Sequence, residues 1–343
     1  MKRVPPAVMA AVLAALLLAA CAPSDAPYDS LEVGVFVPGV ASGSPIYEML
    51  VEGVRRAVEA TPGASMTVVE AGFNQAEWLD KLSALAGSGK FGLIVTSNPA
   101  LPELCTVVAE QYPRARFLVA DAWLQGNEAI HTVLYNQLEQ GYLAGYLAGL
   151  VTTGGAPGSN PDKKVGLVIA QTYPTLDKLI EPGFRAGLAA VDPAIELETR
   201  VVGNWFDAAK AGELAKGLFD SGVDVVLPIA GGANQGVLSV ASESGRRVIL
   251  LESGAGVNYD PAVVAGSAWI AQDRLVEEKV KALLGGAKGL YGTAEVKGFA
   301  EGYVGFADDA PWFLALPAET RERFAAAEKA LAAGAPAFPV TGF

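Results

Sequence analysis

The sequence predicts an α/β protein of two lobes, each built on a doubly wound parallel sheet. Its 343 residues, 51% of them hydrophobic, are enough for two packed domains. Short β-branched runs alternate with longer segments of helical period, which is typical of parallel strands joined by crossover helices. The alternation forms two series, separated at residues 152–163 by a loop rich in Gly, Pro, Ser and Asn.

The strands of the two series follow one plan. The first series starts at Leu31, and its predicted strands are 33–37, 66–71, 92–96 and 116–121. The predicted strands of the second series are 165–170, 197–202, 223–228 and 247–252. Val33-Gly34-Val35 leads to Glu52-Gly53-Val54-Arg55 much as Val165-Gly166-Leu167 leads to Pro182-Gly183-Phe184-Arg185. This internal repeat favours two lobes of like design, although generic strand–helix patterning produces similar repeats.

The remaining segments are too few for a third domain. They are a strand at 262–269, a helix at 272–284, a β-like stretch at 296–306 and a helix at about 318–333. We expect them to complete both lobes, with several crossings that form a hinge. The expected N-terminal lobe is 31–137 with about 263–290, and the expected C-terminal lobe is 138–262 with about 291–343. Loops after the carboxyl ends of the strands would then face one cleft.

The first twenty residues predict an export signal. Lys2 and Arg3 precede an uncharged run that ends in Leu18-Ala19-Ala20-Cys21. The run is shorter than the roughly twenty residues that span a bilayer. Small residues before a cysteine resemble a bacterial lipoprotein signal, which predicts removal of residues 1–20, a lipid on Cys21 and a tether over 21–30. An ordinary secretory signal with an incidental cysteine is the alternative.

Composition excludes several functions. The net charge of −12 argues against nucleic-acid binding, because an acidic surface repels phosphate backbones. One His and two Cys leave no metal site rich in His and no disulfide framework, and Cys105 is expected to be a buried structural thiol. The motifs G-x-x-x-x-G-K and G-x-S-x-G are missing, and Gly87-Ser88-Gly89-Lys90 is predicted to be a turn. The chain is therefore predicted to be a binding protein without cofactor, metal or catalytic residues.

Aromatic, acidic and amide side chains follow the predicted strands. In the first series they are Ser97, Asn98, Asp121 and Trp123, and in the second series Trp205, Phe206, Gly231, Gly232 and Glu252. Aromatic faces stack on flat rings, while Asp and Asn hold ring nitrogens and hydroxyls. The set predicts a site for a hydroxylated heterocycle, although each residue alone also suits capping or turn chemistry.

Several motifs in register resemble one known family. They are Asn136-x-x-Glu139-Gln140-Gly141, Pro182-Gly183-Phe184-Arg185, Gly203-Asn204-Trp205-Phe206-Asp207 and Ala230-Gly231-Gly232. Over nearly the whole mature chain they resemble the basic membrane protein family of substrate-binding lipoproteins. The resemblance implies a periplasmic-binding-protein type I fold and a monomer anchored by lipid to the outer face of the cell membrane. It also implies delivery of a ligand to the permease and ATPase of an ABC importer, and the best-known members bind purine nucleosides.

The resemblance also implies roles for single residues. The base-contacting Asp matches Asp121, and the stacking aromatic matches Phe206, or Trp205 if the register shifts by one. The family's second-lobe glycine matches Gly231 or Gly232, and Glu252 replaces its ribose-holding Asp.

The chain departs from nucleoside binders in two further places. The first loop, 41–47, lacks their Asp or Asn before Ser-Phe, and their Lys is Ile270 or Ala271 here. Tyr47, Trp269 and Trp123 bring aromatic rings to these regions, which favours riboflavin, with its wider ring system, over a purine nucleoside. A sensory lipoprotein, or a periplasmic α/β enzyme using Asp121 or Glu252, are the alternatives from other classes.

Overall fold

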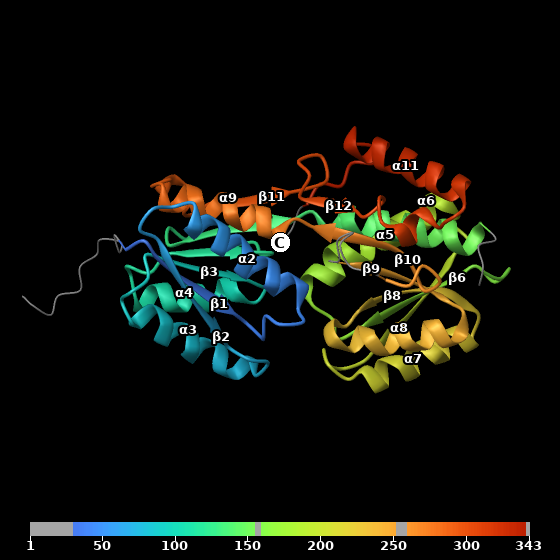
Figure 1. Cartoon of the computed structure of the whole chain (residues 1–343), viewed down its shortest axis with the longest axis horizontal. Helices are drawn as coiled ribbons and strands as arrows, with labels where there is room; N and C mark the ends of the chain where they lie inside the picture. Colours follow the sequence, from blue (N-terminus) through green and yellow to red (C-terminus); the bar gives the residue numbers. More distant parts are fainter. Residues whose placement is uncertain (1–29, 155–158, 252–258, 341–343) are drawn as a thin grey trace, which may run out of the picture.

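The computed structural model describes residues 30–154, 159–251 and 259–340, which form two lobes side by side (Figure 1). The sheet of the N-lobe has the order β11-β5-β4-β3-β1-β2, and that of the C-lobe has the order β12-β10-β9-β8-β6-β7. The two orders correspond strand for strand, which confirms two doubly wound lobes of like design. The predicted signal at 1–20, Cys21 and the tether up to residue 29 lie outside the described residues.

The strands of the N-lobe sheet all pair in parallel. They are β1 (Glu32–Val37), β2 (Ser65–Glu70), β3 (Leu93–Ser97), β4 (Phe117–Ala120), β5 (Ile130–Tyr135) and β11 (Ala294–Lys297). The helices that cover this sheet are α2 (Pro45–Glu59), α3 (Trp78–Gly87), α4 (Leu101–Gln111) and α9 (Gln272–Leu284).

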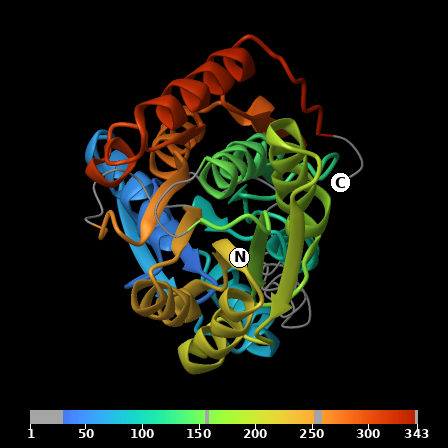
Figure 2. The same cartoon turned by 90° about the vertical axis from the view of Figure 1, so that its right-hand side faces the viewer.

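The C-lobe sheet is parallel except for β12, which pairs antiparallel with β10. Its strands are β6 (Lys164–Ile169), β7 (Glu196–Val201), β8 (Val223–Ile229), β9 (Arg247–Leu251), β10 (Val264–Ile270) and β12 (Val304–Phe306). Its helices are α5 (Gln137–Thr153), α6 (Glu181–Val191), α7 (Ala208–Asp220), α8 (Asn234–Ser244), α10 (Pro311–Leu314) and α11 (Ala318–Ala332). Figure 2 shows α11 on the outer side of the lobe, beside α5.

Burial explains why the strands could be predicted from the sequence. β3, β4, β5 and β8 are buried along their whole length, so their apolar runs are nearly continuous. β2 and β7 stand at the edges of their sheets and keep several side chains exposed. The eight strands predicted in the two series match β1 to β4 and β6 to β9, and each bound differs by at most one residue.

The described chain crosses between the lobes three times, and the first crossing lies where it was expected, near residue 137, whereas the other two lie elsewhere. β5 leads into α5 of the C-lobe, β10 leads into α9 of the N-lobe, and β11 leads back to β12. Because β10 pairs with β9, the second crossing comes at residue 271 rather than near 263. Because β11 pairs with β5, the third comes at residue 298 rather than near 291. The β-like stretch 296–306 is thus two strands in two sheets, since an apolar pattern predicts a strand but not the sheet it joins.

The first crossing depends on glycines where α5 meets α6. A methyl group at Gly145 would lie 2.0 Å from the carbonyl oxygen of Phe184, and one at Gly183 would lie 2.2 Å from that of Leu138. The two helix backbones therefore touch, and most residues of α5 are buried.

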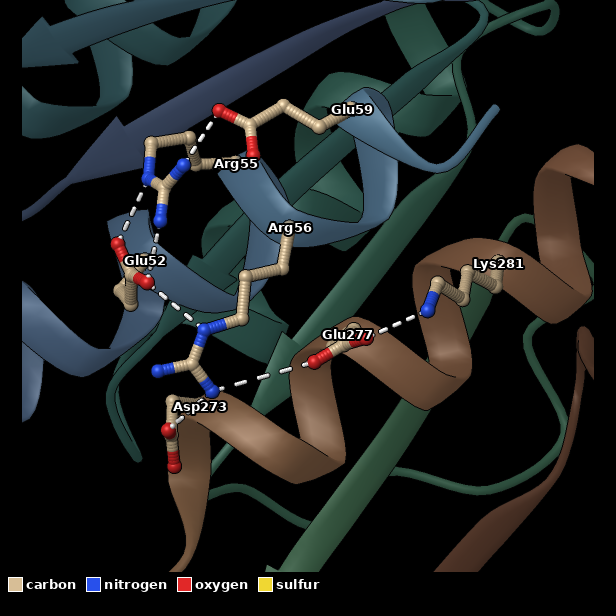
Figure 3. A network of polar contacts seen from close by, with 7 residues as sticks. All are labelled: Glu52, Arg55, Arg56, Glu59, Asp273, Glu277 and Lys281. Atoms are coloured by element: carbon tan, nitrogen blue, oxygen red, sulfur yellow. Dashed lines mark hydrogen bonds and ion pairs between the residues drawn. The ribbon is translucent and has the colours of Figure 1, made fainter. Parts of the chain in front are cut away.

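The second crossing is held by a close contact and an ionic network between α2 and α9 (Figure 3). A methyl group at Gly53 would lie 2.4 Å from the carbonyl oxygen of Asp273. Beside this contact, Arg56 pairs with Glu52 at 2.7 Å and with Asp273 at 2.8 Å. Hydrogen bonds from Arg55 and Arg56 lower the pKa of Glu52 to about 2. These pairs are partly exposed, so they contribute little to stability.

The third crossing is bound from both lobes. On the C-lobe side, a carboxylate oxygen of Glu139 accepts a hydrogen bond from the Phe299 backbone N–H at 2.7 Å. On the N-lobe side, Arg274 lies over the ring of Tyr303 at 4.2 Å from its centroid and donates to the Gly302 carbonyl oxygen at 2.7 Å. The loop 298–303 is therefore anchored at both ends.

His131 joins β5 to the region of β11. Its ring is fully buried, with Nδ1 3.1 Å from the Thr293 carbonyl oxygen and Nε2 3.4 Å from Glu295. Burial lowers the pKa of His131 below its usual 6.5, against a smaller opposing effect of the bond to Thr293. The His131 side chain is therefore a buried structural histidine that links β5 to β11.

We predict that Gly145→Ala destabilises the protein by about 1–3 kcal/mol, because the added methyl group overpacks the α5–α6 contact. Gly217→Ala, in α7 with open space at its Cβ position, is the matched control and should be neutral or slightly stabilising. Urea unfolding followed by circular dichroism measures both variants. Equal stability losses in the two variants would contradict the contact.

The single histidine also gives a pH prediction. Because the folded pKa of His131 lies below the unfolded value, its contribution to stability is present above about pH 6.5 and is lost as the pH falls. The imidazole proton signal in NMR should titrate with a midpoint below 6.5. A midpoint above 6.5 would show that the charge of Glu295 outweighs burial.

Candidate functional site

The carboxyl ends of both sheets face the opposite lobe. β5 passes directly into α5 and β10 directly into α9, so these strand ends lie at the crossings. We define the interlobe edge as the loops that follow the parallel strands. In the N-lobe they are residues 38–47, 71–74, 97–98 and 121–124, and in the C-lobe 170–175, 202–207 and 230–234. Ligands of open α/β folds bind at such edges.

The N-lobe half of the edge carries a row of side chains set by strand order. Because β4, β3, β1 and β2 are neighbours, Asp121, Asn98, Tyr47 and Phe73 follow one another along it. The Asn98 amide donates a hydrogen bond to the Tyr47 hydroxyl at 3.3 Å. Tyr47 and Asn98, two of the predicted ligand residues, are therefore in contact and half-buried.

Two aromatic rings flank the loop after β1. A side chain at Gly39 would lie 3.0 Å from the Tyr47 ring and 3.6 Å from the Phe73 ring. Glu70, the last residue of β2, accepts a hydrogen bond from the Ala41 backbone N–H at 2.8 Å and so fixes this loop. Phe73 is 67% exposed.

Asp121 follows β4 with a left-handed backbone, at φ 53°. Non-glycine residues in this region are strained and gather at functional sites. Burial of Tyr135, together with the nearby charge of Asp121, raises the pKa of Tyr135 well above its usual value. Asp121 is half-buried, and Trp123, two residues further, is half-buried as well.

Ser97 has an internal partner rather than a place on the surface of the edge. Its hydroxyl is buried and donates to the side-chain oxygen of Gln272 at 3.0 Å. The Gln272 amide in turn donates to the carbonyl oxygen of Ile46 at 2.6 Å. Ser97 therefore connects β3 to the start of α9, and its neighbour Asn98 is the side chain that this strand end presents.

On the C-lobe half of the edge, Trp205 and Phe206, which the sequence left as alternatives, have different surroundings. Trp205 is half-buried and contacts Tyr173, with ring centroids 5.8 Å apart and planes at 54°. A methyl group at Gly231, whose φ is 57°, would lie 3.5 Å from the indole ring. Phe206 is 72% exposed, although Asn204 fixes its backbone by accepting from the Phe206 N–H at 3.0 Å. Trp205 is thus packed, and Phe206 presents its ring to solvent.

The other predicted residues lie less clearly at this edge. Gly232 is exposed beside Gly231, with the carbonyl oxygen of Trp205 3.5 Å from its Cβ position. The Trp269 indole lies across Gly305 of β12, where a Cβ atom would be 2.2 Å from the ring. Glu252 lies outside the described residues.

Sequence reasoning missed two aromatic residues of the edge. Phe73 follows β2, and Tyr173 follows β6. The correspondence of the two lobes is the signal that would have found Phe73, because β2 matches β7, the strand before Phe206.

Other features of the described residues give no second site. A hollow of about 420 Å³ lies at the amino ends of the N-lobe strands, beside Leu31 and Arg116, and another of about 450 Å³ lies on the surface of α7 and α8. Neither is at the interlobe edge. Cys105 is fully buried, and burial raises the pKa of its thiol.

The same described ranges contain neither a candidate metal cluster nor a helix that could span a membrane. No cluster of three or more His, Cys, Asp and Glu side chains there is able to hold a metal ion. Each helix of those ranges is too short or too polar to span a bilayer.

Two lobes of matching sheet order joined by three crossings define the periplasmic-binding-protein type I fold. The fold is shared with an ABC transporter solute-binding protein from Aeropyrum pernix K1, at a TM-score of 0.76, 19% identity and coverage of 91% of this chain and 94% of that one. Residues 30–326 match the family model described as ABC transporter substrate-binding protein PnrA-like. The chain belongs to this family, which confirms the resemblance found in the sequence.

Two relatives align with part of the chain. The CD4+ T-cell-stimulating antigen of Listeria monocytogenes is 26% identical over 207 residues, 60% of this chain and 52% of that protein. The ABC transporter nucleoside-binding protein BmpA of Lactococcus lactis subsp. cremoris is 27% identical over 142 residues, 41% of this chain and 38% of that protein. The aligned part of this chain thus spans about half the length of the Listeria protein, or less for BmpA.

We predict that Ser97→Ala destabilises the protein by about 1–3 kcal/mol, because it leaves a buried oxygen of Gln272 without its shorter hydrogen bond. Ser239→Ala, at an exposed site on α8, is the control and should stay within about 0.5 kcal/mol of the parent. Thermal and urea unfolding measure the difference. A Ser97→Ala variant as stable as the control would mean that the buried bond contributes nothing.

Proposed function

We propose that this ABC substrate-binding protein captures riboflavin between its lobes. The observation that carries the proposal is the number of aromatic rings on both halves of the interlobe edge. Tyr47 and Phe73 lie on the N-lobe half, and Tyr173, Trp205 and Phe206 lie on the C-lobe half. A flat tricyclic ring gains about 0.5–1.5 kcal/mol from each aromatic pair beyond the burial of its surface.

Polar groups beside these rings suit the rest of the molecule. Asp121 and Asn98 lie in the same row as Tyr47, where a carboxylate accepts from a ring N–H and an amide serves carbonyl or hydroxyl groups. The net charge of −12 favours a neutral vitamin over its phosphorylated forms. Trp269 and Trp123 are the aromatic residues that we propose for the margin of the site.

The proposed mechanism is capture by closure. Each lobe carries half of the site, so contacts from both lobes form only when the lobes approach. The ligand shifts an open–closed equilibrium by its higher affinity for the closed form. The closed surface is what the permease and its ATPase would recognise, and a lipid on Cys21 would hold the protein at the outer face of the membrane.

A purine nucleoside is the second candidate. Asp121 stands where the family's base-contacting Asp is expected, and the Lactococcus relative is named as nucleoside-binding. The missing family Lys and the missing first-loop Asp or Asn argue against it, because a site loses discrimination when such hydrogen bonds are absent. Conversion of a bound ligand to a product would instead indicate an enzyme.

Purified protein should quench riboflavin fluorescence on binding, and guanosine should compete weakly. Replacing Trp205 and Phe206 together with Ala should weaken riboflavin binding more than tenfold, because two of the three rings of the C-lobe half are lost. Leu314→Ala, an exposed apolar residue on α10, is the control and should bind like the parent. Tight guanosine or inosine binding without riboflavin quenching would establish the nucleoside alternative. Unchanged affinity in the double variant would refute the site.

A further inference from the structure

Phe73 and Phe206 are the most exposed large hydrophobic residues of the described ranges, at 67% and 72%. A single exposed hydrophobic side chain needs no explanation. These two occupy corresponding places, because β2 and β7 are the matching edge strands and each ring lies in the loop that follows. The coincidence of exposure and position suggests one shared function.

Both rings lie on the side of the interlobe edge that is farthest from the crossings. The first crossing leaves from β5, which is separated from β2 by β4, β3 and β1. At about 4.8 Å per strand this is about 19 Å. The lobes join along the side of β11, β12 and α5, and β2 lies away from it (Figure 1). A rotation about the crossings therefore moves the Phe73 and Phe206 loops farther than any loop nearer the crossings.

The backbone beside each ring is fixed although the ring is exposed. The Gly72 carbonyl oxygen accepts from the Trp78 indole at 2.8 Å, and the Gly72 N–H donates to the Gly39 carbonyl oxygen at 2.9 Å. In the other lobe Asn204 accepts from the backbone N–H groups of both Phe206 and Asp207. Each ring is therefore held out by an ordered loop.

We infer that Phe73 and Phe206 are a closing pair. When the lobes approach, the two rings meet over the outer edge of the bound heterocycle and exclude water from it. Phe73 is thereby a ligand-contacting residue of the N-lobe that the motifs did not assign. The inference rests on the proposed function for the identity of the ligand, but not for the meeting of the two rings.

Cross-linking tests whether the rings meet. The full-length variant Phe73→Cys/Phe206→Cys is treated with bis-maleimidoethane, with and without riboflavin. Cys105 is fully buried and does not compete, and Cys21, the other cysteine of the chain, is replaced by Ser in both cysteine pairs. Intramolecular cross-linking should exceed that of the control pair Phe73→Cys/Leu314→Cys severalfold and should rise further with riboflavin.

The outcomes separate this inference from the proposed function. A yield no higher than that of the control pair, with and without ligand, overturns the closing pair. A high yield in a protein that binds neither riboflavin nor guanosine supports the closing pair and overturns the proposed function. If the parent binds riboflavin but the ligand leaves the yield unchanged, the closing pair is also overturned.

Affinity tests the contact with the ligand. Phe73→Ala should weaken riboflavin binding about tenfold, which corresponds to about 1.4 kcal/mol. Phe73→Leu should stay within about threefold of the parent, because it keeps an apolar side chain over the ligand. The exposure of Phe73 means that neither variant should unfold the protein. Equal affinities of Phe73→Ala and the parent would refute the contact.

Discussion

The backbone of α5 lies directly against that of α6, and this contact fixes where the first crossing brings the chain into the C-lobe. Gly145 allows α5 to reach the Phe184 carbonyl oxygen, and no larger residue fits there. Because α5 is the continuation of β5, the N-lobe strand ends must point at the C-lobe. In the same way, the α2–α9 contact makes the C-lobe strand ends point at the N-lobe. Two helix contacts that bind no ligand therefore position the interlobe edge.

Much of this fold could be predicted from the sequence because most of its strands, other than the edge strands β2 and β7, are largely buried. The apolar runs of the two series gave the strands, and the repeat gave the likeness of the lobes. The second and third crossings were misplaced because pairing partners are set by contacts between distant residues. β10 and β11 have ordinary strand sequences, and only their partners β9 and β5 reveal the lobe of each.

Site residues could be predicted from the sequence where their position at a strand end decides their role. They could not be predicted where the orientation of the side chain decides it. Asn98 and Asp121 were found because they end parallel strands. Ser97 was included for the same reason, yet its hydroxyl turns inward to Gln272, since neighbouring strand residues face opposite sides. Neither motif nor strand-end logic separated Trp205 from Phe206, whereas burial assigns one ring to packing against Tyr173 and the other to solvent.

The loop 298–303 constrains how the two lobes move relative to each other. It is tied to Glu139 on one lobe and Arg274 on the other, and it runs beside the two other crossings. A single linker would allow twisting and sliding as well as bending. Three linkers side by side restrict twisting and sliding more than bending. The topology therefore guides the closing rotation and selects, before any ligand arrives, which residues of the two lobes approach each other.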